Sequence, residues 1–314
     1  MHPLTQDLPK PLLPVGLHTL LEHQVASLAE VGVERVVLAT SYRAADFTEV
    51  VRSLRTKGID LTTVVEETAR GTGGGLRGAM QALPGAGTVV VLNGDLLTGH
   101  DLRTQVDTLQ FAPSEVLVCV HVREVPDARA YGCVLTDDRG RVTDFVEKSP
   151  APPSRIVNAG TYVVRHQLAA EIPEGIVSLE RQVFPALAAR GALLAHREDA
   201  YFLDVGTPAA LVQANRDLVL GAGPSWLVRT GPEARALIAP GALVDPSASI
   251  VGGSVVHTGA RVARGARVDG AVVLTDAKIG PDAVVSRSVI GREARVGSGA
   301  RVVDTAIGTG RLAR

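Results

Sequence analysis

Aromatic residues and long apolar runs are scarce in this chain of 314 residues. Aromatic residues make up only 3% of the sequence, while 46% is hydrophobic and 21% is charged. We therefore expect a folded protein whose core is packed with Val, Leu and Ala. No apolar run approaches the roughly 20 residues that cross a bilayer, and no basic stripe accompanies the net charge of −1. These absences argue against a membrane protein and against nucleic acid as a partner.

Cysteine is limited to two residues, Cys119 and Cys133, each in an apolar segment that predicts a strand. Two isolated thiols of this kind are typical of buried, reduced cysteines in the cytoplasm. The first 16 residues contain four prolines and lack the apolar region of a signal peptide. We therefore expect a cytoplasmic protein.

Residues 237–308 repeat every six residues, with branched aliphatic side chains at one position and small residues at another. An α-helix returns to the same face after about 3.6 residues, so this period is not that of a helix. It predicts a parallel β-helix with the aliphatic side chains inward and the small residues at the corners. A one-residue slip falls near residues 271–277. The aliphatic series is Ile238, Val244, Ile250, Val256, Val262 and Val268, and the small series is Ala242, Ala248, Ser254, Ala260 and Ala266.

The first 220 residues alternate between aliphatic runs and segments with helical spacing. This alternation predicts an α/β fold with a mainly parallel sheet. The runs at 36–39 and 88–92 predict buried strands, the second buried on both faces, and a hairpin is predicted to turn at Asp138-Arg139-Gly140. Further strands are expected at 61–65, 115–122, 158–164 and 201–205, and helices at 17–31, 46–54, 102–109, 179–190 and 207–219.

The length suits two domains. A stretch rich in Gly and Pro at 221–225 separates the two patterns described above. We therefore expect an α/β domain in residues 1–220, a linker in 221–236 and a β-helix in 237–314.

Two aspartates follow predicted strands. Asp95 comes directly after the run at 88–92, and Asp204 ends the run at 201–205. Open α/β sheets bind ligands at the carboxyl ends of their strands, and Gly94 lets the backbone approach a ligand closely. A carboxylate there suits Mg²⁺, which takes one or two carboxylates together with phosphate oxygens. The alternative is that each aspartate caps a turn or the next helix, and spacing alone does not show whether the two share one ion.

Two lysines and a glycine run could contact an anion. Lys10 stands between two prolines that stiffen the segment, and Lys148 follows Glu147 at the end of a predicted strand. Each lysine could hold a phosphate or could be a solvated side chain. The run Gly71–Gly75 precedes a helical segment and could present backbone N–H groups to an anion or a base. It matches neither of the common glycine-rich phosphate motifs.

Seven segments of the sequence are PLTQDLPKPLLPVG, ARGTGGGL, VLNGD, YGCVLTDDRGRVTDFVEK, NAGTYV, SLERQVFPAL and YFLDVGTP. Taken together, they resemble the sugar-1-phosphate nucleotidylyltransferases, in the order seen in that family. The similarity covers nearly the whole chain and is greatest to the GDP-mannose pyrophosphorylase (mannose-1-phosphate guanylyltransferase) branch, notably through GTGGGL and NGD. The resemblance implies a Rossmann-like mixed sheet nucleotidyltransferase domain followed by a left-handed parallel β-helix of hexapeptide repeats, with homo-oligomers formed through the β-helix.

The resemblance also implies a reaction and roles for residues. The phosphate of a sugar 1-phosphate, here mannose 1-phosphate, would attack the α-phosphorus of an NTP, here GTP, and release pyrophosphate. Asp95 and Asp204 would hold Mg²⁺, Lys148 would contact the sugar phosphate and Lys10 the nucleotide phosphates, so that Lys148, Asp95 and Lys10 are the catalytic residues. The residues implied to contact substrate are Gly71, Thr72, Gly73, Asn93, Gly132, Glu147, Asn158 and Gly160.

The sequence departs from the family at its first residues. The family opens with a strand and a loop of the form GGxGTRLxPLT, whereas this sequence begins Met1-His2-Pro3-Leu4-Thr5. We expect the true start to lie upstream and a form that begins at Met1 to be poorly active. The reason is that the triphosphate would lose the backbone N–H donors of that loop.

Three other functions fit the sequence. The first is the same reaction with glucose 1-phosphate and dTTP, UTP or ATP, which substrate profiling would separate. The second is a non-catalytic subunit that binds sugar nucleotide and regulates an active partner. The third is an acyltransferase that works through the β-helix with His257 as base, although the repeat places His257 in an outward loop.

Overall fold

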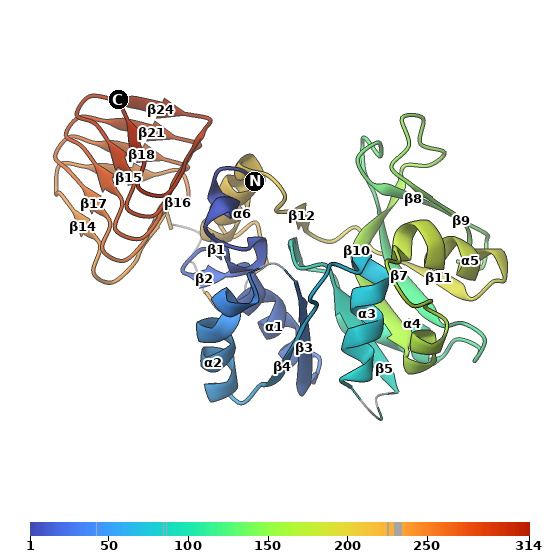
Figure 1. Ribbon diagram of the computed structural model, residues 1–314. Helices are drawn as coiled ribbons and strands as arrows, with labels where there is room; N and C mark the ends of the chain where they lie inside the picture. The colour runs from blue at the N-terminus through green and yellow to red at the C-terminus, as the bar shows by residue number, and fades with distance from the viewer. Residues whose placement is uncertain (42, 84, 86, 225, 229–233) are drawn as a thin grey trace. The chain divides into compact units, whose positions relative to one another are not determined.

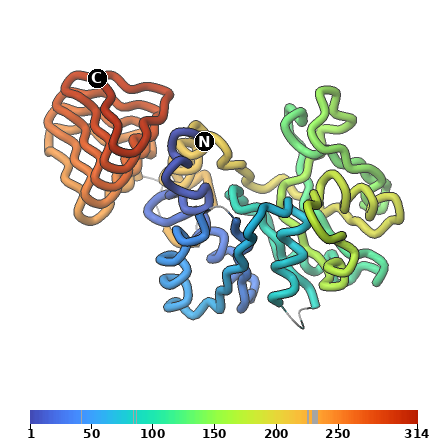
Figure 2. The backbone as a smooth tube through the Cα atoms, viewed as in Figure 1, coloured from blue at the N-terminus to red at the C-terminus, as the bar shows by residue number. Residues whose placement is uncertain are grey.

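The computed structural model describes residues 1–314 apart from residues 42, 84, 86, 225 and 229–233. The chain forms two compact units, which Figure 1 shows as ribbons and Figure 2 as a backbone trace. The sheet unit comprises residues 28–93 and 100–202, and the β-helix unit comprises residues 1–27, 94–99 and 203–314. The predicted linker at 221–236 includes residues 225 and 229–233, which lie outside the described residues.

A mixed six-stranded sheet forms the centre of the sheet unit, in the order β11-β7-β10-β8-β9, with β5 also paired to β10. β10 runs antiparallel to β5, β7 and β8, and only β11 is parallel to its neighbour β7. The mixed sheet is therefore confirmed. The mainly parallel sheet is wrong, because the β8–β9 hairpin and the central β10 introduce antiparallel pairs. The strands are β5 (Thr88–Leu92), β7 (Val118–Glu124), β8 (Gly132–Thr136), β9 (Val142–Glu147), β10 (Ile156–Arg165) and β11 (Leu193–Arg197).

A separate parallel pair joins β3 (Arg35–Thr40) to β4 (Asp60–Val65). Among the described strands, β3 pairs only with β4 and β5 only with β10. The strands predicted at 36–39 and 88–92 are present, but their side chains are half-buried or exposed instead of buried. β3 and β5 are therefore each paired along one edge only among the described strands. Their side chains have no neighbours from a second strand, which leaves them more exposed.

Helices of the sheet unit begin at residues that favour a first turn. The Asp101 carboxylate caps α4 by accepting the N–H groups of Arg103 and Thr104. α5 follows a short π-helical turn, η5, which Ser178 caps. The elements are η3 (Ala44–Phe47), α2 (Thr48–Thr56), α3 (Gly71–Gln81), α4 (Leu102–Gln110), η4 (His166–Ala170), η5 (Leu179–Val183) and α5 (Phe184–Ala189).

The core of this unit is mostly aliphatic, as expected, but three of its few rings meet at its centre. The Phe184 ring lies 5.0 Å from that of Tyr162 and 5.3 Å from that of Phe145, measured between centroids. Both cysteines are buried and free, and burial raises the pKa of Cys119 to about 12. The expectation of buried thiols is confirmed.

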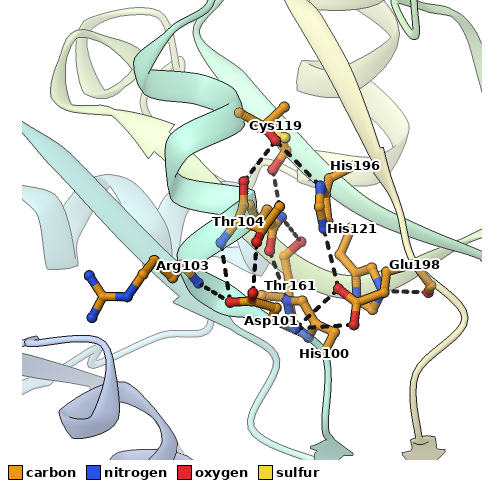
Figure 3. A network of polar contacts seen from close by, with 11 residues as sticks. His100, Asp101, Arg103, Thr104, Cys119, His121, Thr161, His196 and Glu198 are labelled. Carbon is orange, nitrogen blue, oxygen red and sulfur yellow. Dashed lines mark hydrogen bonds and ion pairs between the residues drawn. The ribbon is translucent and has the colours of Figure 1, made fainter.

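A network of polar side chains is buried beside the start of α4 (Figure 3). The rings of His100 and His121 stack with centroids 3.9 Å apart, and His196 Nε2 lies 3.4 Å from Glu198 Oε2. His121 Nε2 contacts the Glu198 carbonyl oxygen at 3.0 Å, and His100 Nε2 contacts Gln105 Oε1 at 2.9 Å. Because these oxygens only accept hydrogen bonds, each Nε2 carries the proton. Burial lowers the pKa of both imidazoles, to about 3 for His121.

The second unit contains the parallel β-helix that the repeat predicted. Its strands stack in three parallel sheets, and the aliphatic residues of the repeat, such as Val256, Val262 and Val268, fill the interior. The first coil is 18 residues long, pairing Ala236 with Ser254, and the next is 17, pairing Val255 with Val272. The predicted one-residue slip is confirmed.

The three sheets are formed by short strands. The first contains β13 (Ala236–Ile238), β16 (Ser254–Val256), β19 (Val272–Val273), β22 (Val289–Ile290) and β25 (Ala306–Ile307). The second contains β14 (Leu243–Val244), β17 (Arg261–Val262), β20 (Lys278–Ile279), β23 (Arg295–Val296) and β26 (Leu312–Ala313). The third contains β15 (Ser249–Val251), β18 (Arg267–Asp269), β21 (Val284–Ser286) and β24 (Arg301–Val303).

One outer face of the β-helix is apolar and covered. Val255, Val272 and Val289 alternate with inward residues and so point outward, yet each is at most 1% exposed. Helix α6 (Pro208–Val219) packs against this face at β16, where Arg216 Nε donates to the Gly252 carbonyl at 3.2 Å. The valine face therefore joins the β-helix to the rest of its unit.

The remaining elements of this unit are short. Thr19 and Glu22 cap α1 reciprocally, since each backbone N–H donates to the other side chain. Asn215 of α6 accepts the Gly16 N–H at 2.8 Å and donates to the Pro14 carbonyl at 3.0 Å. The elements are η1 (Leu4–Gln6), η2 (Lys10–Leu12), β1 (Pro14–Val15), β2 (His18–Thr19), α1 (Leu20–Glu30, which continues into the sheet unit), β6 (Leu96–Thr98) and β12 (Phe202–Asp204).

Candidate active site

Asp95 directly precedes a strand whose partner strand ends at Asp204. β5 ends at Leu92, and the chain turns through Asn93 and Gly94 to place Asp95 directly before β6. β6 pairs with β12, whose last residue is Asp204. The Val205 N–H donates to the Asp95 carbonyl at 2.8 Å. The backbone thus brings together two aspartates that are far apart in the sequence.

Lys10 joins this pair. Its Nζ lies 3.2 Å from Asp95 Oδ2, and both side chains remain partly exposed. Pro9 precedes the short helix that begins at Lys10, and the buried Leu12 anchors that helix. Gly94 packs closely here, since a Cβ at this position would lie 3.2 Å from Pro11 Cγ. Lys10, Asp95 and Asp204 form the acidic group of the β-helix unit, a name used below for these three residues.

A second group of polar residues surrounds a bulge in β10. The register between β10 and β7 shifts between Asn158 and Tyr162, where Gly160 has a φ of 67°. Asn158 Oδ1 accepts the Gly160 N–H at 2.9 Å, and its Nδ2 donates to Tyr162 Oη at 2.9 Å. The Asn93 N–H donates to the Gly160 carbonyl at 3.0 Å. Such a bulge redirects the side chains around it.

The β8–β9 hairpin supplies Gly132, Glu147 and Lys148. Gly132 lies opposite Glu147, and a Cβ at Gly132 would come within 2.7 Å of Glu147 Oε2. Lys148 has a φ of 48°, and its Nζ lies 3.8 Å from Glu147 Oε1. Burial raises the pKa of Glu147, the charge of Glu180 raises it further, and Lys148 and Arg181 oppose the shift.

The glycine run is itself the first turn of α3, which begins at Gly71. The Gly73 N–H donates to the Val177 carbonyl at 2.8 Å. Thr72 Oγ1 donates to Glu180 Oε2 at 2.7 Å and accepts the Leu179 N–H at 2.9 Å. The turn is therefore fixed by the segment 177–180.

The structure thus divides the predicted residues into two sets. The sheet unit holds Lys148 and all eight residues implied to contact substrate, and the β-helix unit holds the acidic group. The sequence did not indicate Tyr162, Glu180 or Arg181, although all three fall within the segments NAGTYV and SLERQVFPAL that carried the resemblance. Their apolar or helical surroundings gave no separate signal for a site.

His257 does not lie in an outward loop. It is only 9% exposed, and burial lowers its pKa to about 4. Its N–H donates to the Val273 carbonyl in the coil below. The expected exposure is wrong because His257 directly follows β16, a strand of the covered valine face.

No group of three or more His, Cys, Asp or Glu side chains able to hold a metal occurs among the residues that the structure describes. Two carboxylates on paired strands still fit Mg²⁺, because that ion keeps several waters and binds through one or two carboxylates plus phosphate oxygens.

None of the helices in the described parts of the chain is long and apolar enough to cross a membrane.

Comparison with known proteins agrees with this architecture. Residues 1–219 match the nucleotidyl transferase family, and residues 233–311 match the family described as the GMPPB C-terminal domain. The chain belongs to the nucleotidyl transferase family and is a nucleotidyltransferase.

Two similar proteins are mannose-1-phosphate guanylyltransferases. The chain is 39% identical over 273 residues to the mannose-1-phosphate guanylyltransferase of Mycobacterium tuberculosis, covering 86% of this chain and 75% of that protein. It is 29% identical over 278 residues to mannose-1-phosphate guanylyltransferase 1 of Arabidopsis thaliana, covering 84% and 76%. A putative glucose-1-phosphate thymidylyltransferase from Bacillus anthracis shares the fold, with a TM-score of 0.64 at 22% identity over 74% of this chain and 92% of that chain.

Proposed function

We propose that this protein transfers GMP from GTP to mannose 1-phosphate, giving GDP-mannose and pyrophosphate. The observation that carries the proposal is the cluster of Asn93, Gly132, Glu147, Asn158 and Gly160 at the bulge of β10 and the β8–β9 hairpin. These residues come from segments far apart in the sequence, and all match the implied substrate contacts. The names of the two guanylyltransferase relatives support GTP and mannose 1-phosphate as the particular substrates.

The proposed reaction is a displacement at the α-phosphorus of GTP. An oxygen of the sugar phosphate forms a bond to that phosphorus, the bond to the β-phosphate oxygen breaks, and pyrophosphate leaves. The nucleophile is already an anionic phosphate, so no side chain has to remove a proton from it. The protein instead has to position two highly charged substrates and offset their charge.

Each group of residues has a role in this proposal. Glu147 and Asn158 accept and donate hydrogen bonds to sugar hydroxyls, and the missing Cβ of Gly132 leaves the Glu147 carboxylate room. Lys148, whose side chain is 62% exposed, is free to hold the sugar phosphate. Lys10 offsets charge on the nucleotide phosphates.

Mg²⁺ is proposed to bind Asp95 and Asp204, where it would neutralise charge on the phosphate oxygens. The partly exposed Asp95 carboxylate and the hydrogen-bonded strand pair provide hard oxygen ligands of the kind that Mg²⁺ prefers. Assembly into homo-oligomers through the β-helix stays a prediction from the resemblance, and light scattering of the purified chain measures it.

Substrate profiling tests the proposal. Pyrophosphate release should be fastest with GTP and mannose 1-phosphate when GTP, ATP, UTP and dTTP are each paired with mannose 1-phosphate or glucose 1-phosphate. Faster release with glucose 1-phosphate and another NTP would replace the assignment with a related nucleotidyl transfer. Binding of GDP-mannose without release of pyrophosphate would support a regulatory subunit instead.

A further inference from the structure

Glu180 links two segments that are more than 100 residues apart in the sequence. Its Oε2 accepts hydrogen bonds from Thr72 Oγ1 at 2.7 Å and from Ser178 Oγ at 2.9 Å. Thr72 Oγ1 in turn accepts the Leu179 N–H at 2.9 Å. The hydroxyl proton of Thr72 is therefore committed to a carboxylate, and charge-assisted bonds of this kind are the stronger ones.

Backbone contacts tighten the same junction. The Val177 N–H donates to the Arg70 carbonyl and the Gly73 N–H to the Val177 carbonyl, both at 2.8 Å. Gly71 has a φ of 73°, and a Cβ there would lie 2.5 Å from the Val177 oxygen. Backbone hydrogen bonds before and within the first turn of α3 thus hold this turn against the segment 177–180. Among the described residues, Glu180 is the only acidic residue that contacts a side chain of the turn.

Glu180 also acts on the group around β10. Its negative charge raises the pKa of Glu147 and adds to the effect of burial on the pKa of Tyr162. Tyr162 is fully buried and shares hydrogen bonds with the side chains of Asn158 and Asn93. Burial and, to a smaller extent, the charge of Glu180 both favour the protonated form of the Tyr162 hydroxyl, which takes part in both bonds.

We propose that Glu180 is a positioning residue that couples the first turn of α3, at the nucleotide, to Glu147 and the Asn158–Tyr162 pair, at the sugar. The inference rests on the proposed function for its substrates, but the geometry of the coupling is independent of it. In this role Glu180 acts through Thr72 and through the residues of the sugar subsite. It fixes Thr72 by a hydrogen bond, and η5, the turn that carries Glu180, packs against β9, the strand that ends at Glu147.

Two substitutions separate the two effects. Glu180→Gln keeps an oxygen for the Thr72 hydroxyl but removes the charge, so the KM for GTP should change less than about threefold. The acid limb of the pH profile of kcat/KM for mannose 1-phosphate should move to lower pH, because Glu147 loses a neighbouring negative charge. Glu180→Ala removes both contacts and should raise the KM for GTP by about 10- to 100-fold, the range expected for a charge-assisted bond.

Variants of Thr72 and a nearby glutamate serve as controls. Thr72→Val should raise the KM for GTP as Glu180→Ala does, without moving the acid limb, and Thr72→Ser, which keeps the hydroxyl, should raise it less than Thr72→Val. The double variant Glu180→Ala/Thr72→Val should raise the KM for GTP no more than either single variant does, because both remove the same hydrogen bond. Glu174→Gln, an exposed neighbour paired with Arg77, should change neither the KM nor the pH profile.

Amide hydrogen exchange distinguishes failure of this inference from failure of the proposed function. Amides of residues 71–75 should exchange faster in Glu180→Ala and Thr72→Val than in Glu174→Gln, with no substrate present. If the unaltered protein does not use GTP and mannose 1-phosphate, the proposed function fails and the exchange result still decides the coupling. Unchanged exchange in Glu180→Ala, or an unmoved acid limb in an active Glu180→Gln enzyme, overturns the role of Glu180.

Discussion

The ammonium group of Lys10 lies 3.2 Å from the Asp95 carboxylate, in a pair that remains open to solvent. Exposed ion pairs of this kind contribute roughly 0–1 kcal/mol to stability. The charges are therefore available for a ligand, and their removal should affect binding more than folding. Lys10→Met should raise the KM for GTP at least about tenfold while the free energy of unfolding changes by less than about 1 kcal/mol. A stability loss large enough to explain the activity loss would show that Lys10 is structural.

Asp95→Asn and Asp204→Asn should each lower turnover by about 10²-fold or more, as expected when a charge-stabilising element is removed. Each should also reduce Mg²⁺ affinity, which calorimetry with Mg²⁺ alone can follow without turnover. Asp107→Asn on the exposed side of α4 is a matched control and should leave both quantities unchanged. Near-normal turnover in Asp204→Asn contradicts a shared metal ion.

Lys148→Ala should raise the KM for mannose 1-phosphate much more than the KM for GTP. Alanine adds no backbone strain at the φ of 48°, because both residues carry a Cβ. Steady-state kinetics with each substrate varied in turn give the two constants. Lys278→Ala on the outer face of the β-helix serves as a control for loss of a lysine. Equal effects on the two substrates would assign Lys148 a structural role.

The stacked histidines predict that the fold weakens in acid. Burial holds the folded-state pKa of His100 and His121 below the unfolded value near 6.5. The unfolded chain therefore takes up protons that the folded chain does not, and stability falls as the pH drops below about 6.5. His121 Nδ1 is buried without a hydrogen-bond partner, so a proton there has no acceptor.

Urea unfolding at pH 7.5 and pH 5.0 measures this effect. His121, with a folded-state pKa of about 3, should by itself cost up to about 2 kcal/mol over that range. The charged and titratable neighbours of the two stacked rings are Asp101, Arg123, His196 and Glu198. His121→Gln, or His100→Phe if that variant folds poorly, should lose less stability than the unaltered protein. The same pH dependence in a folded variant would show that other groups control it.

The valine face gives a matched pair of positions on the β-helix. Val272 and Val284 both point outward, but Val272 is 1% exposed and Val284 is half-buried beside Arg267 and Arg301. Val272→Glu should lower the free energy of unfolding by about 3 kcal/mol or more, because it buries a carboxylate without a partner. Val284→Glu should change it by less than about 0.5 kcal/mol. Equal denaturation midpoints would show that the face is not covered in solution.

The sequence predicted the elements better than it predicted their pairing. The period of six gave the β-helix and even its shortened coil, because the inward residues of stacked coils must align one above another. The repeat could not show which outer face would be covered. Val272 and Val284 are both valines that directly precede an inward-pointing valine, so the sequence does not distinguish them. The parallel sheet was wrong because pairing of β10 with β5 and β7 depends on contacts between distant segments.

The same limit applied to the candidate site. Lys10, Asp95 and Asp204 could be singled out by their positions at strand ends or between prolines, but only the fold shows that Lys10 pairs with Asp95. Glu180 and His121 escaped notice because each lies in a segment whose local pattern is simply helix or strand. Their partners Thr72 and His100 are remote in the sequence, and a contact of that kind leaves no periodic trace.

The covered face formed by Val255, Val272 and Val289 bears on how this architecture can be exchanged between relatives. A β-helix whose outer surfaces were all polar could be grafted onto another nucleotidyltransferase as an independent module. Here α6 and the coils bury one another, so a hybrid protein must transfer matching residues on both sides of the seam. A chain cut near residue 220 would expose apolar residues of α6. In a chimera joined there, the apolar residues of α6 would pack against a β-helix face of different shape.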